Sequence, residues 1–277
     1  MTVPKLSDLD TSESIKMFLF GNPGCGKTCF ASTFPGPIYY YDFDGKVTSA
    51  KEFLEVRKPS KINEIDFDQF RPLPTVSTDE IYTRFQTKLM EMENKIKEGK
   101  FEYKTVVFDS CTLFWEALMR WVIKTNPGIK RVSENVPAQN DYQIAGSQFR
   151  HILLRLAAFP CNVLVTGHIK TDKDDETGRM EFKPAVSGSL VNFIPALFEE
   201  VYRAYVSTDE DGKKTYLAQT HNDGKYDCRS QIPGIPEVVR LSYRSILDAK
   251  KNGKELARKA LQTNKKSTNN QRAQAHA

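Results

Sequence analysis

The chain has 277 residues, a formal net charge of +5, and 39% hydrophobic and 27% charged residues. This length is enough for one sizeable core, and we expect one domain of somewhat over 200 residues with frayed ends. No apolar run approaches the ~20 residues of a membrane span, and the first fourteen residues resemble neither a secretion nor an import signal, which excludes an integral membrane protein and favours a cytoplasmic location.

Apolar runs alternate with helical patterns in the first half of the chain. Residues 15–20 read as a strand that runs into a glycine-rich loop, and a helix follows this loop. A second strand is expected from Ile38 to about Tyr41, before acidic residues and Gly45. The stretch from Lys58 to Pro74 is irregular apart from one short strand, and a long charged helix is expected from about Thr78 to Lys97.

The same alternation continues in the second half. A buried strand is expected from Tyr103 to Ser110, then a helix from Cys111 to about Lys124 and another from about Asp141 to Ala158. A third β-branched strand lies within Cys161–His168. The polar stretch Ile169–Ser187 is too long for an ordinary connection, which predicts a mobile functional loop.

Two more strands, residues 199–207 and 214–221, are expected to form a hairpin, and a final helix is expected from about Glu237 to Lys250. Strands that alternate with helices favour an α/β fold with a mainly parallel sheet flanked by helices, which the antiparallel hairpin extends. Ligands of such sheets bind at the carboxyl ends of the strands. We therefore expect the functional site at that edge.

The positive charge is concentrated at the end of the chain. From Lys250 to Ala277, eight basic residues and one acidic residue give a local charge of +7. We expect a flexible segment at residues 1–14, a core at 15–250, and a basic, disordered tail at 251–277. Such a tail attracts nucleic-acid phosphates, although a solubilising terminus without a target explains the composition equally well.

Residues 21–28, GNPGCGKT, match the pattern G-x-x-x-x-G-K-[S/T] between a predicted strand and a predicted helix, the context of a phosphate-binding loop. In such loops backbone N–H groups surround a phosphate, a lysine, here Lys27, contacts the β- and γ-phosphates, and a hydroxyl, here Thr28, binds Mg²⁺. We predict ATP and Mg²⁺ as ligands. The expected nucleotide-binding residues are Gly21, Asn22, Pro23, Gly24, Cys25, Gly26, Lys27, Thr28 and Cys29.

The five cysteines form no C-x-x-C pair, which favours reduced thiols and no zinc site. Cys25 lies between two glycines of the loop, and we expect its side chain to point away from the phosphates. Proximity to the positive end of a helix predicts a lowered pKa for its thiol. Alkylation of Cys25 should therefore inhibit nucleotide binding.

Three side chains at strand ends complete the predicted site. Asp109, expected on a strand beside the first, would hold a water of the Mg²⁺ shell, with a helix cap as the alternative. Asp44, also expected from a strand neighbouring the loop, is preferred as the base over Asp42, which backbone N–H groups could hold, although both could be turn residues. His168 is expected to contact the γ-phosphate and report its loss to the following loop, with a surface or capping role as the alternative.

The segments GNPGCGKT, YYDFDG, TVVFDS and VLVTGHIK occur in the order found in RecA-like recombinases, which the chain resembles from about Ile15 to Arg229. The resemblance is closest to phage-encoded proteins that consist of a RecA core and anneal single strands. It implies a RecA-like P-loop NTPase core in which Asp44 activates water and Asp109 contacts the metal shell. The family's sensing strand usually ends in glutamine, where this chain has His168.

The resemblance also implies a DNA interface. Two loops of RecA-like proteins face single-stranded DNA, and by position these are 124–140 and 169–187. The basic residues expected to contact phosphates are Lys130, Arg131, Lys170, Lys173, Arg179 and Lys183. A basic finger that reaches the neighbouring subunit's nucleotide is expected at Lys225 or Arg229. The implied partners are single-stranded DNA, further copies of the chain in a ring or filament, and a single-strand DNA-binding protein.

Together these features predict an ATP-hydrolysing RecA-like protein that single-stranded DNA stimulates and that promotes annealing or homologous recombination, in the cytoplasm of a bacterial host if it is phage-encoded. One alternative is a small-molecule P-loop kinase, which would need an arginine-rich lid where residues 169–187 have only Arg179. Another is a nucleotide-gated DNA-binding module without hydrolysis, in which Asp44 is a turn residue.

Overall fold

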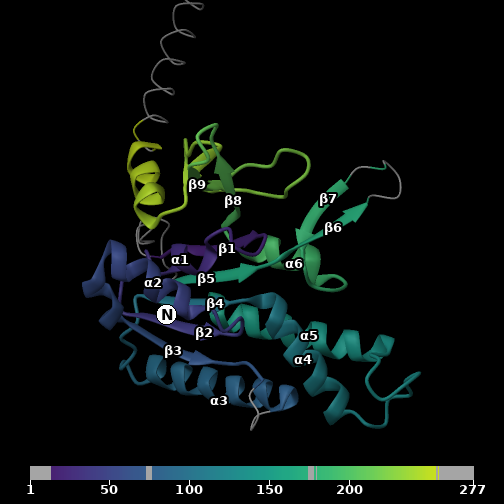
Figure 1. Cartoon of the computed structure of the whole chain (residues 1–277). Coiled ribbons are helices and arrows are strands. Elements are labelled where there is room, and N and C mark those ends of the chain that lie inside the picture. Colours follow the sequence, from purple (N-terminus) through teal and green to yellow (C-terminus); the bar gives the residue numbers. More distant parts are fainter. Residues whose placement is uncertain (1–13, 73–76, 174–177, 179, 254, 256–277) are drawn as a thin grey trace, which may run out of the picture.

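The computed structural model describes residues 14–72, 77–173, 178, 180–253 and 255 (Figure 1). The expected terminal segments 1–14 and 251–277 lie almost entirely outside these residues. No helix in the described part of the chain is both long and apolar enough to cross a membrane.

An eight-stranded sheet forms the centre of the fold, in the order β10-β9-β8-β1-β5-β4-β2-β3. Its strands are β1 (Lys16–Gly21), β2 (Ile38–Asp42), β3 (Ile65–Gln69), β4 (Thr105–Asp109), β5 (Asn162–Gly167), β8 (Glu200–Thr208), β9 (Lys214–Gln219) and β10 (Val238–Arg240). The strands from β8 to β3 pair in parallel, whereas β8–β9 and β9–β10 are antiparallel. The sheet is the expected mainly parallel RecA-like P-loop core with a hairpin extension, which confirms the predicted fold class.

Helices cover both faces of this sheet. They are α1 (Lys27–Ala31), α2 (Val47–Arg57), the 3-10 helix η2 (Pro59–Glu64), α3 (Thr78–Lys97), α4 (Cys111–Thr125), α5 (Gln139–Ala157) and α6 (Leu190–Leu197). Residues 243–253 are also helical. The sequence analysis predicted α3, α4 and α5 closely but did not identify α2 or α6.

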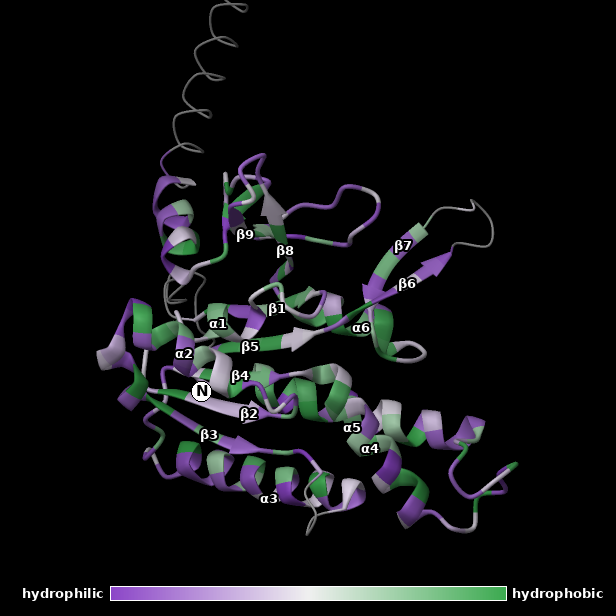
Figure 2. Cartoon of the chain, in the orientation of Figure 1, coloured by the Kyte–Doolittle hydropathy of each residue, from purple (hydrophilic) through white to green (hydrophobic). Residues whose placement is uncertain are grey.

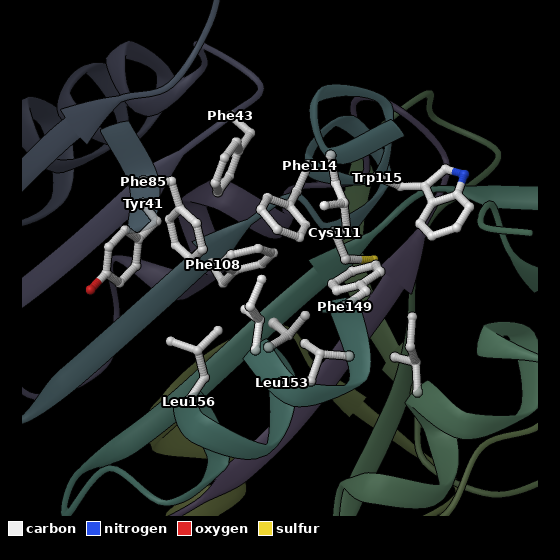
Figure 3. Close-up of a cluster of buried hydrophobic side chains, with 14 of the residues drawn as sticks. Tyr41, Phe43, Phe85, Phe108, Cys111, Phe114, Trp115, Phe149, Leu153 and Leu156 are labelled. Atoms are coloured by element: carbon white, nitrogen blue, oxygen red, sulfur yellow. The ribbon is translucent and has the colours of Figure 1, made fainter. Parts of the chain in front are cut away.

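Alternation along the strands divides the core into two clusters, because successive side chains of a strand point to opposite faces. Phe18 and Phe20 of β1 pack with residues of α3, α4 and α5 in one cluster, part of which Figure 3 shows. Met17 and Leu19 pack with Phe30 of α1 in the other. Figure 2 shows the difference between the apolar central strand β5 and the polar edge strand β3. Burial on both faces explains why the central strands read as continuous apolar runs.

The strand order corrects two predictions about neighbours. We expected the strand of Asp109 beside the first strand, but β5 lies between β1 and β4, and β2, which precedes Asp44, lies beyond β4. Neither strand therefore neighbours the strand that enters the glycine loop. The predictions were wrong because an apolar run that is buried on both faces carries no signal of which strand lies beside it. The carboxyl ends of all four strands still meet at one edge, since they are parallel.

Residues 169–187 also differ from the prediction. Their described part forms a separate antiparallel pair of strands, β6 (Ile169–Lys173) and β7 (Met180–Pro184), which projects from the carboxyl edge of the sheet (Figure 1). We predicted a mobile functional loop here and did not identify its two strands, because a two-stranded ribbon buries little surface and so carries only a weak apolar pattern. Residues 174–177 and 179, including Arg179, lie outside the described part.

The last predicted helix begins later than expected. Residues 238–240, which we placed inside it, form β10 and pair antiparallel with β9. The helix starts only at residue 243. The chain after β10 thereby runs back along α1, because the N–H of Tyr243 donates a hydrogen bond to Oγ1 of Thr33 at 2.9 Å.

Candidate active site

The glycine-rich loop connects β1 to α1 at the carboxyl edge of the sheet. Gly24 and Gly26 have φ angles of 79° and 88°, which side chains rarely allow, so glycine is required at both positions. The buried ammonium of Lys27, with 6% of the residue exposed, donates hydrogen bonds to the carbonyl oxygens of Gly21 at 2.9 Å and Asn22 at 3.1 Å. These neutral acceptors leave the charge of Lys27 uncompensated, and a phosphate group would supply the opposite charge.

The two cysteines of the loop region face the interior. Cys25 is 4% exposed, and its Sγ lies 3.8 Å from Nζ of Lys27. Burial raises the pKa of the Cys25 thiol, and the charge of Lys27 opposes this only in part. The prediction of a lowered pKa was therefore wrong, because burial outweighs the positive surroundings. Sγ of Cys29 contacts the carbonyl oxygen of Ser49 in α2 at 3.4 Å and so turns toward that helix.

Asp109 at the end of β4 contacts the glycine loop directly. The Thr28 hydroxyl donates a hydrogen bond to its Oδ2 at 2.7 Å, and the Thr166 hydroxyl donates one to its Oδ1. Asp109 is 1% exposed, and burial, together with the nearby carboxylate of Asp44, raises its pKa. The alternative role for Asp109 was to cap a helix. Ser110 has that role instead, because its Oγ accepts a hydrogen bond from the N–H of Leu113 at the start of α4.

This pair of residues fits Mg²⁺. A carboxylate and a hydroxyl are the hard oxygen ligands that Mg²⁺ prefers, usually together with waters and substrate phosphates. Within the described residues, the carboxylate of the buried Asp109 accepts hydrogen bonds from two hydroxyls and from no charged group, so a cation would stabilise its charged form. Thr28 and Asp109 are 81 residues apart in the sequence, and the structure brings their side chains into contact.

Asp44, Ser110 and His168 form a second cluster from three neighbouring chain segments. Oδ1 of Asp44 accepts a hydrogen bond from the Ser110 hydroxyl at 2.6 Å, and Oδ2 lies 3.0 Å from Nε2 of His168. Nζ of Lys46 lies 3.6 Å from the same carboxylate, whose side chain is 3% exposed. Burial alone would raise the pKa of Asp44, but the hydrogen bonds from His168 and Ser110 outweigh it and lower this pKa. The carboxylate is therefore held in its ionised form.

Asp42 has a different environment, as expected. Its carboxylate accepts hydrogen bonds from the N–H groups of Lys46 at 3.1 Å and Val47 at 3.3 Å, and from Nε2 of Gln69 at 3.3 Å. The residue is fully buried. The prediction that backbone N–H groups hold Asp42 is confirmed, and Asp44 remains the carboxylate of this segment that faces the ends of β4 and β5.

His168 lies at the end of β5, where it was predicted, but its contact is a carboxylate. Nε2 faces Asp44, the backbone N–H donates a hydrogen bond to Oγ1 of Thr112 at 3.0 Å, and the backbone carbonyl accepts one from the N–H of Ala185 at 2.9 Å. In the described part of the chain, the buried Nδ1 atom has no hydrogen-bond partner. His168 therefore connects the catalytic carboxylate candidate to the β6–β7 pair.

Two of the predicted DNA-contacting residues have structural partners instead. Arg131 donates two hydrogen bonds to Asp141 at 2.8 and 2.6 Å and one to the carbonyl oxygen of Asn126 at 2.9 Å. Lys183 pairs with Glu181 at 2.5 Å. Lys130 and Lys173 are exposed. Sequence reasoning could not identify the Arg131 contact, because a basic residue in a polar loop looks the same whether it faces solvent or a buried carboxylate.

Replacing Arg131 should destabilise the fold, whereas replacing Lys130 should not. Arg131 and Asp141 have side chains that are 8% and 0% exposed, so Arg131→Ala leaves a buried carboxylate without its main partner. We expect the Tm of Arg131→Ala to fall by several degrees, measured by thermal unfolding, and that of the neighbouring Lys130→Ala to stay unchanged. Equal Tm values for the two variants would contradict a structural role for Arg131.

The proposed finger residues also differ from each other. The guanidinium of Arg229 donates hydrogen bonds to the carbonyl oxygens of Phe198 at 3.2 and 2.8 Å and to that of Pro195, at the end of α6. Lys225 is exposed. Arg229 could contact another subunit's nucleotide only if these hydrogen bonds broke, which favours a structural role for Arg229. Lys225 is then the side chain that can serve as the finger.

Two adjoining cavities lie apart from the glycine loop, next to the region predicted to face DNA. One, of about 390 Å³, is lined among others by Trp115, Arg120, Tyr142 and Lys170. The other, of about 730 Å³, shares Trp115 and Tyr142 and adds Arg150. The rings of Trp115 and Tyr142 lie 6.4 Å apart at an interplanar angle of 25°, and Trp115 forms the margin of the cluster in Figure 3. Sequence analysis did not identify Arg120 or these aromatic residues as functional candidates.

Ser110 and Thr166 were also missed as site residues. Ser110 and Thr166 carry a weak signal, since each is a hydroxyl residue beside the polar end of a buried strand.

Most of the chain matches one known protein family. The model of a family described as an AAA domain (AAA_24) matches residues 13–230. No curated protein matches the sequence. Similar solved structures include a prototypical ATPase from the type III secretion system of pathogenic bacteria, with 11% identity, a TM-score of 0.47 and coverage of 72% of this chain and 53% of that chain. They also include the RadB recombinase, with 13% identity, a TM-score of 0.42 and coverage of 83% and 89%. This chain thus spans about half the length of the secretion ATPase.

Proposed function

Because the chain belongs to the AAA domain family (AAA_24) and is a P-loop ATPase of the RecA-like type, we propose that it hydrolyses ATP and that single-stranded DNA stimulates this reaction. The observation that carries the proposal is the meeting of Thr28 and Asp109 beside the Asp44 carboxylate. Thr28 and Asp109 as metal ligands, Asp44 as a base and Lys27 as a phosphate-binding lysine would supply the groups that phosphoryl transfer to water requires.

Each side chain has a role in this mechanism. Lys27 would bind the β- and γ-phosphates, and Thr28 and Asp109 would hold Mg²⁺, which would neutralise charge on the phosphate oxygens. Asp44 orients the attacking water and accepts its proton. A carboxylate accepts about four hydrogen bonds, so Asp44 can accept one from this water in addition to those from Ser110 and His168. These two donors fix the direction of the carboxylate.

The two adjoining cavities support the proposed contact with single-stranded DNA. Single-stranded nucleic acid is bound by aromatic rings that stack on bases and by basic side chains that contact phosphates. Tyr142, which is 40% exposed, supplies an accessible ring that rests on the buried ring of Trp115, and Arg120, Lys170 and Arg150 supply positive charge around it. We therefore place the DNA between the two predicted loops, on these residues rather than on Arg131. Annealing or homologous recombination by a ring or filament is the process that we propose this ATPase serves.

Hydrolysis assays with and without single-stranded DNA test the proposal. Stimulation by DNA supports it, turnover that depends on a small acceptor would indicate a kinase, and ATP binding without turnover would indicate a nucleotide-gated module. Nucleotide-dependent particle size with DNA present tests the oligomer.

Replacing Lys170 should weaken DNA binding in a salt-dependent manner. A phosphate contact contributes about 0.7 to the slope of log affinity against log salt concentration for single strands. We expect Lys170→Ala to reduce the slope by about this amount, measured by fluorescence anisotropy, and to reduce stimulation of hydrolysis. Lys51→Ala is the control, because Lys51 lies on α2 and pairs with Glu55 on the surface. A slope that Lys170→Ala leaves unchanged would contradict the placement of DNA in these cavities.

A further inference from the structure

Residues at every fourth position of α5 form a stripe along one wall of the larger cavity. They are Tyr142, Gly146, Arg150 and Leu154, and all of them line this cavity of about 730 Å³. Residues four apart lie on the same face of a helix, one turn from each other. Gly146 therefore leaves a gap in the stripe, with the tyrosine ring one turn before it and the guanidinium group one turn after it.

Packing does not explain the glycine at position 146. Glycine in the interior of a helix is destabilising relative to alanine, because its backbone loses more conformational freedom. Some glycines are required because a neighbour leaves no room, as at Gly21, where a Cβ atom would lie 2.5 Å from the carbonyl oxygen of Ala204. A Cβ atom built on Gly146 would meet no described atom within 4 Å apart from its chain neighbours and the backbone of its own helix. What the glycine provides is open space over α5.

The ring on one side of this space is held in a fixed orientation. Tyr142 packs on the ring of Trp115, and Trp115 packs on Phe149 with a centroid distance of 6.1 Å and an interplanar angle of 24°. Trp115 and Phe149 are buried, whereas Tyr142 is 40% exposed. The accessible part of the Tyr142 ring can therefore stack on a ligand without first losing much side-chain freedom.

The guanidinium on the other side is also held. Arg150 donates a hydrogen bond from Nη2 to Oγ of Ser189, at the start of α6, and its Cζ lies 5.3 Å from the centroid of the Phe193 ring. In the described part of the chain, its buried Nε atom has no hydrogen-bond partner. A guanidinium is planar and stacks on flat ring systems as well as donating hydrogen bonds. Arg150 thus offers a second flat surface one turn from Gly146.

The two adjoining cavities differ in their chemistry. The charged residues that line the smaller one are Arg120, Lys170 and Glu116, with a surplus of positive charge that suits phosphates. Apart from Arg150 and His151, the described side chains that line the larger one are neutral, and several are amides or hydroxyls. The edges of nucleic-acid bases carry neutral donors and acceptors, and their faces stack on rings and guanidinium planes. The larger cavity therefore matches a base, and the smaller one matches the backbone beside it.

We propose that the larger cavity receives one unpaired base of single-stranded DNA, which lies over Gly146 and stacks on Tyr142 and Arg150. This inference rests on the proposed function, because it takes the two cavities as the DNA site. Loss of an aromatic partner weakens binding by about 5- to 150-fold for each stacked base. Stacking accepts every base, so the site should show little sequence preference.

Abasic and ordinary single-stranded oligonucleotides test the inference, because they share the sugar–phosphate backbone and differ in the bases. Gly146→Leu fills the space over α5 with a residue that favours helix. In the full chain we expect it to weaken binding of the ordinary oligonucleotide by about fivefold or more and to leave binding of the abasic one unchanged, both measured by fluorescence anisotropy. The salt dependence should stay unchanged, unlike that of Lys170→Ala, because no phosphate contact is removed.

Further variants separate this effect from a loss of structure. The Tm of Gly146→Leu should equal or exceed that of the unaltered protein, because leucine favours helix more than glycine does. Tyr142→Ala should weaken binding of the ordinary oligonucleotide in the same way, and Tyr142→Phe should not, since the ring remains. Thr83→Leu is the matched control, because Thr83 lies exposed on another helix, α3.

Three outcomes would overturn the inference and leave the proposed function standing. Unchanged binding of the ordinary oligonucleotide in both Gly146→Leu and Tyr142→Ala would mean that no base enters the larger cavity. Equal weakening for the two oligonucleotides would make the cavity a backbone site. Equal affinities of the unaltered protein for the two would mean that it binds no base. Failure of the unaltered protein to bind either oligonucleotide would contradict the proposed DNA contact, and the inference with it.

Discussion

Lys27→Ala should lose nucleotide binding, with an ATP affinity lower by about 100-fold or more, since charged hydrogen bonds to phosphate contribute about 1.5–3 kcal/mol each. The ammonium of Lys27 is buried and donates to two backbone carbonyls of the loop, so its charge is compensated only when phosphate binds. Removal of this charge should not lower the stability of the nucleotide-free protein, because a buried ammonium without an anionic partner is costly.

Thermal unfolding with and without ATP and Mg²⁺ measures both effects. A ligand at 100 times its Kd stabilises the native state by about 2.7 kcal/mol, and this gain should disappear in Lys27→Ala. Lys51→Ala, an exposed lysine on α2, should keep it. If Lys27→Ala shows the same rise of Tm with ATP as the unaltered protein, the triphosphate binds elsewhere and the assignment of the loop is wrong.

The sequence predicted those parts of the site that depend on short contiguous segments and on the ends of strands. The loop from Gly21 to Thr28 is contiguous, and Asp109 and His168 each terminate a strand, so their common edge follows from parallel pairing alone. Thr28 and Asp109 were predicted to serve the same metal, but their direct hydrogen bond was not predicted. The strand of Asp109 was expected beside the first strand, and it still brings Asp109 to the loop because the carboxyl ends of parallel strands share one edge.

The parts that sequence missed depend on distant contacts or on burial. β5 lies between β1 and β4, and the sequence does not indicate this order because these strands are equally apolar. The raised pKa of Cys25 and the pairing of Arg131 with Asp141 depend on how deeply each group is enclosed. A polar sequence likewise concealed the β6–β7 pair, because neither strand has a strongly apolar face.

Asp44→Asn should keep ATP binding and lose turnover, with kcat lower by about 10²- to 10⁴-fold, the usual contribution of a general base. The amide has the shape of the carboxylate, and its oxygen can still accept the hydrogen bond from Ser110, but it cannot accept a proton from water. Because the pKa of Asp44 lies below its ordinary value, the unaltered protein should keep this base ionised down to the ordinary range of a carboxyl group and below it.

Single-turnover hydrolysis and calorimetric ATP binding separate the two effects of this substitution. Asp211→Asn is the control, because Asp211 lies exposed in the β8–β9 turn. Unchanged kcat in Asp44→Asn would show that Asp44 is only a turn residue whose hydrogen bonds order the ends of β2, β4 and β5. Loss of binding as well as turnover would mean that Asp44 supports the loop. Only retained binding with lost turnover identifies the carboxylate as the group that acts on water. A base stabilises the transition state and does not contribute to the affinity for the phosphates.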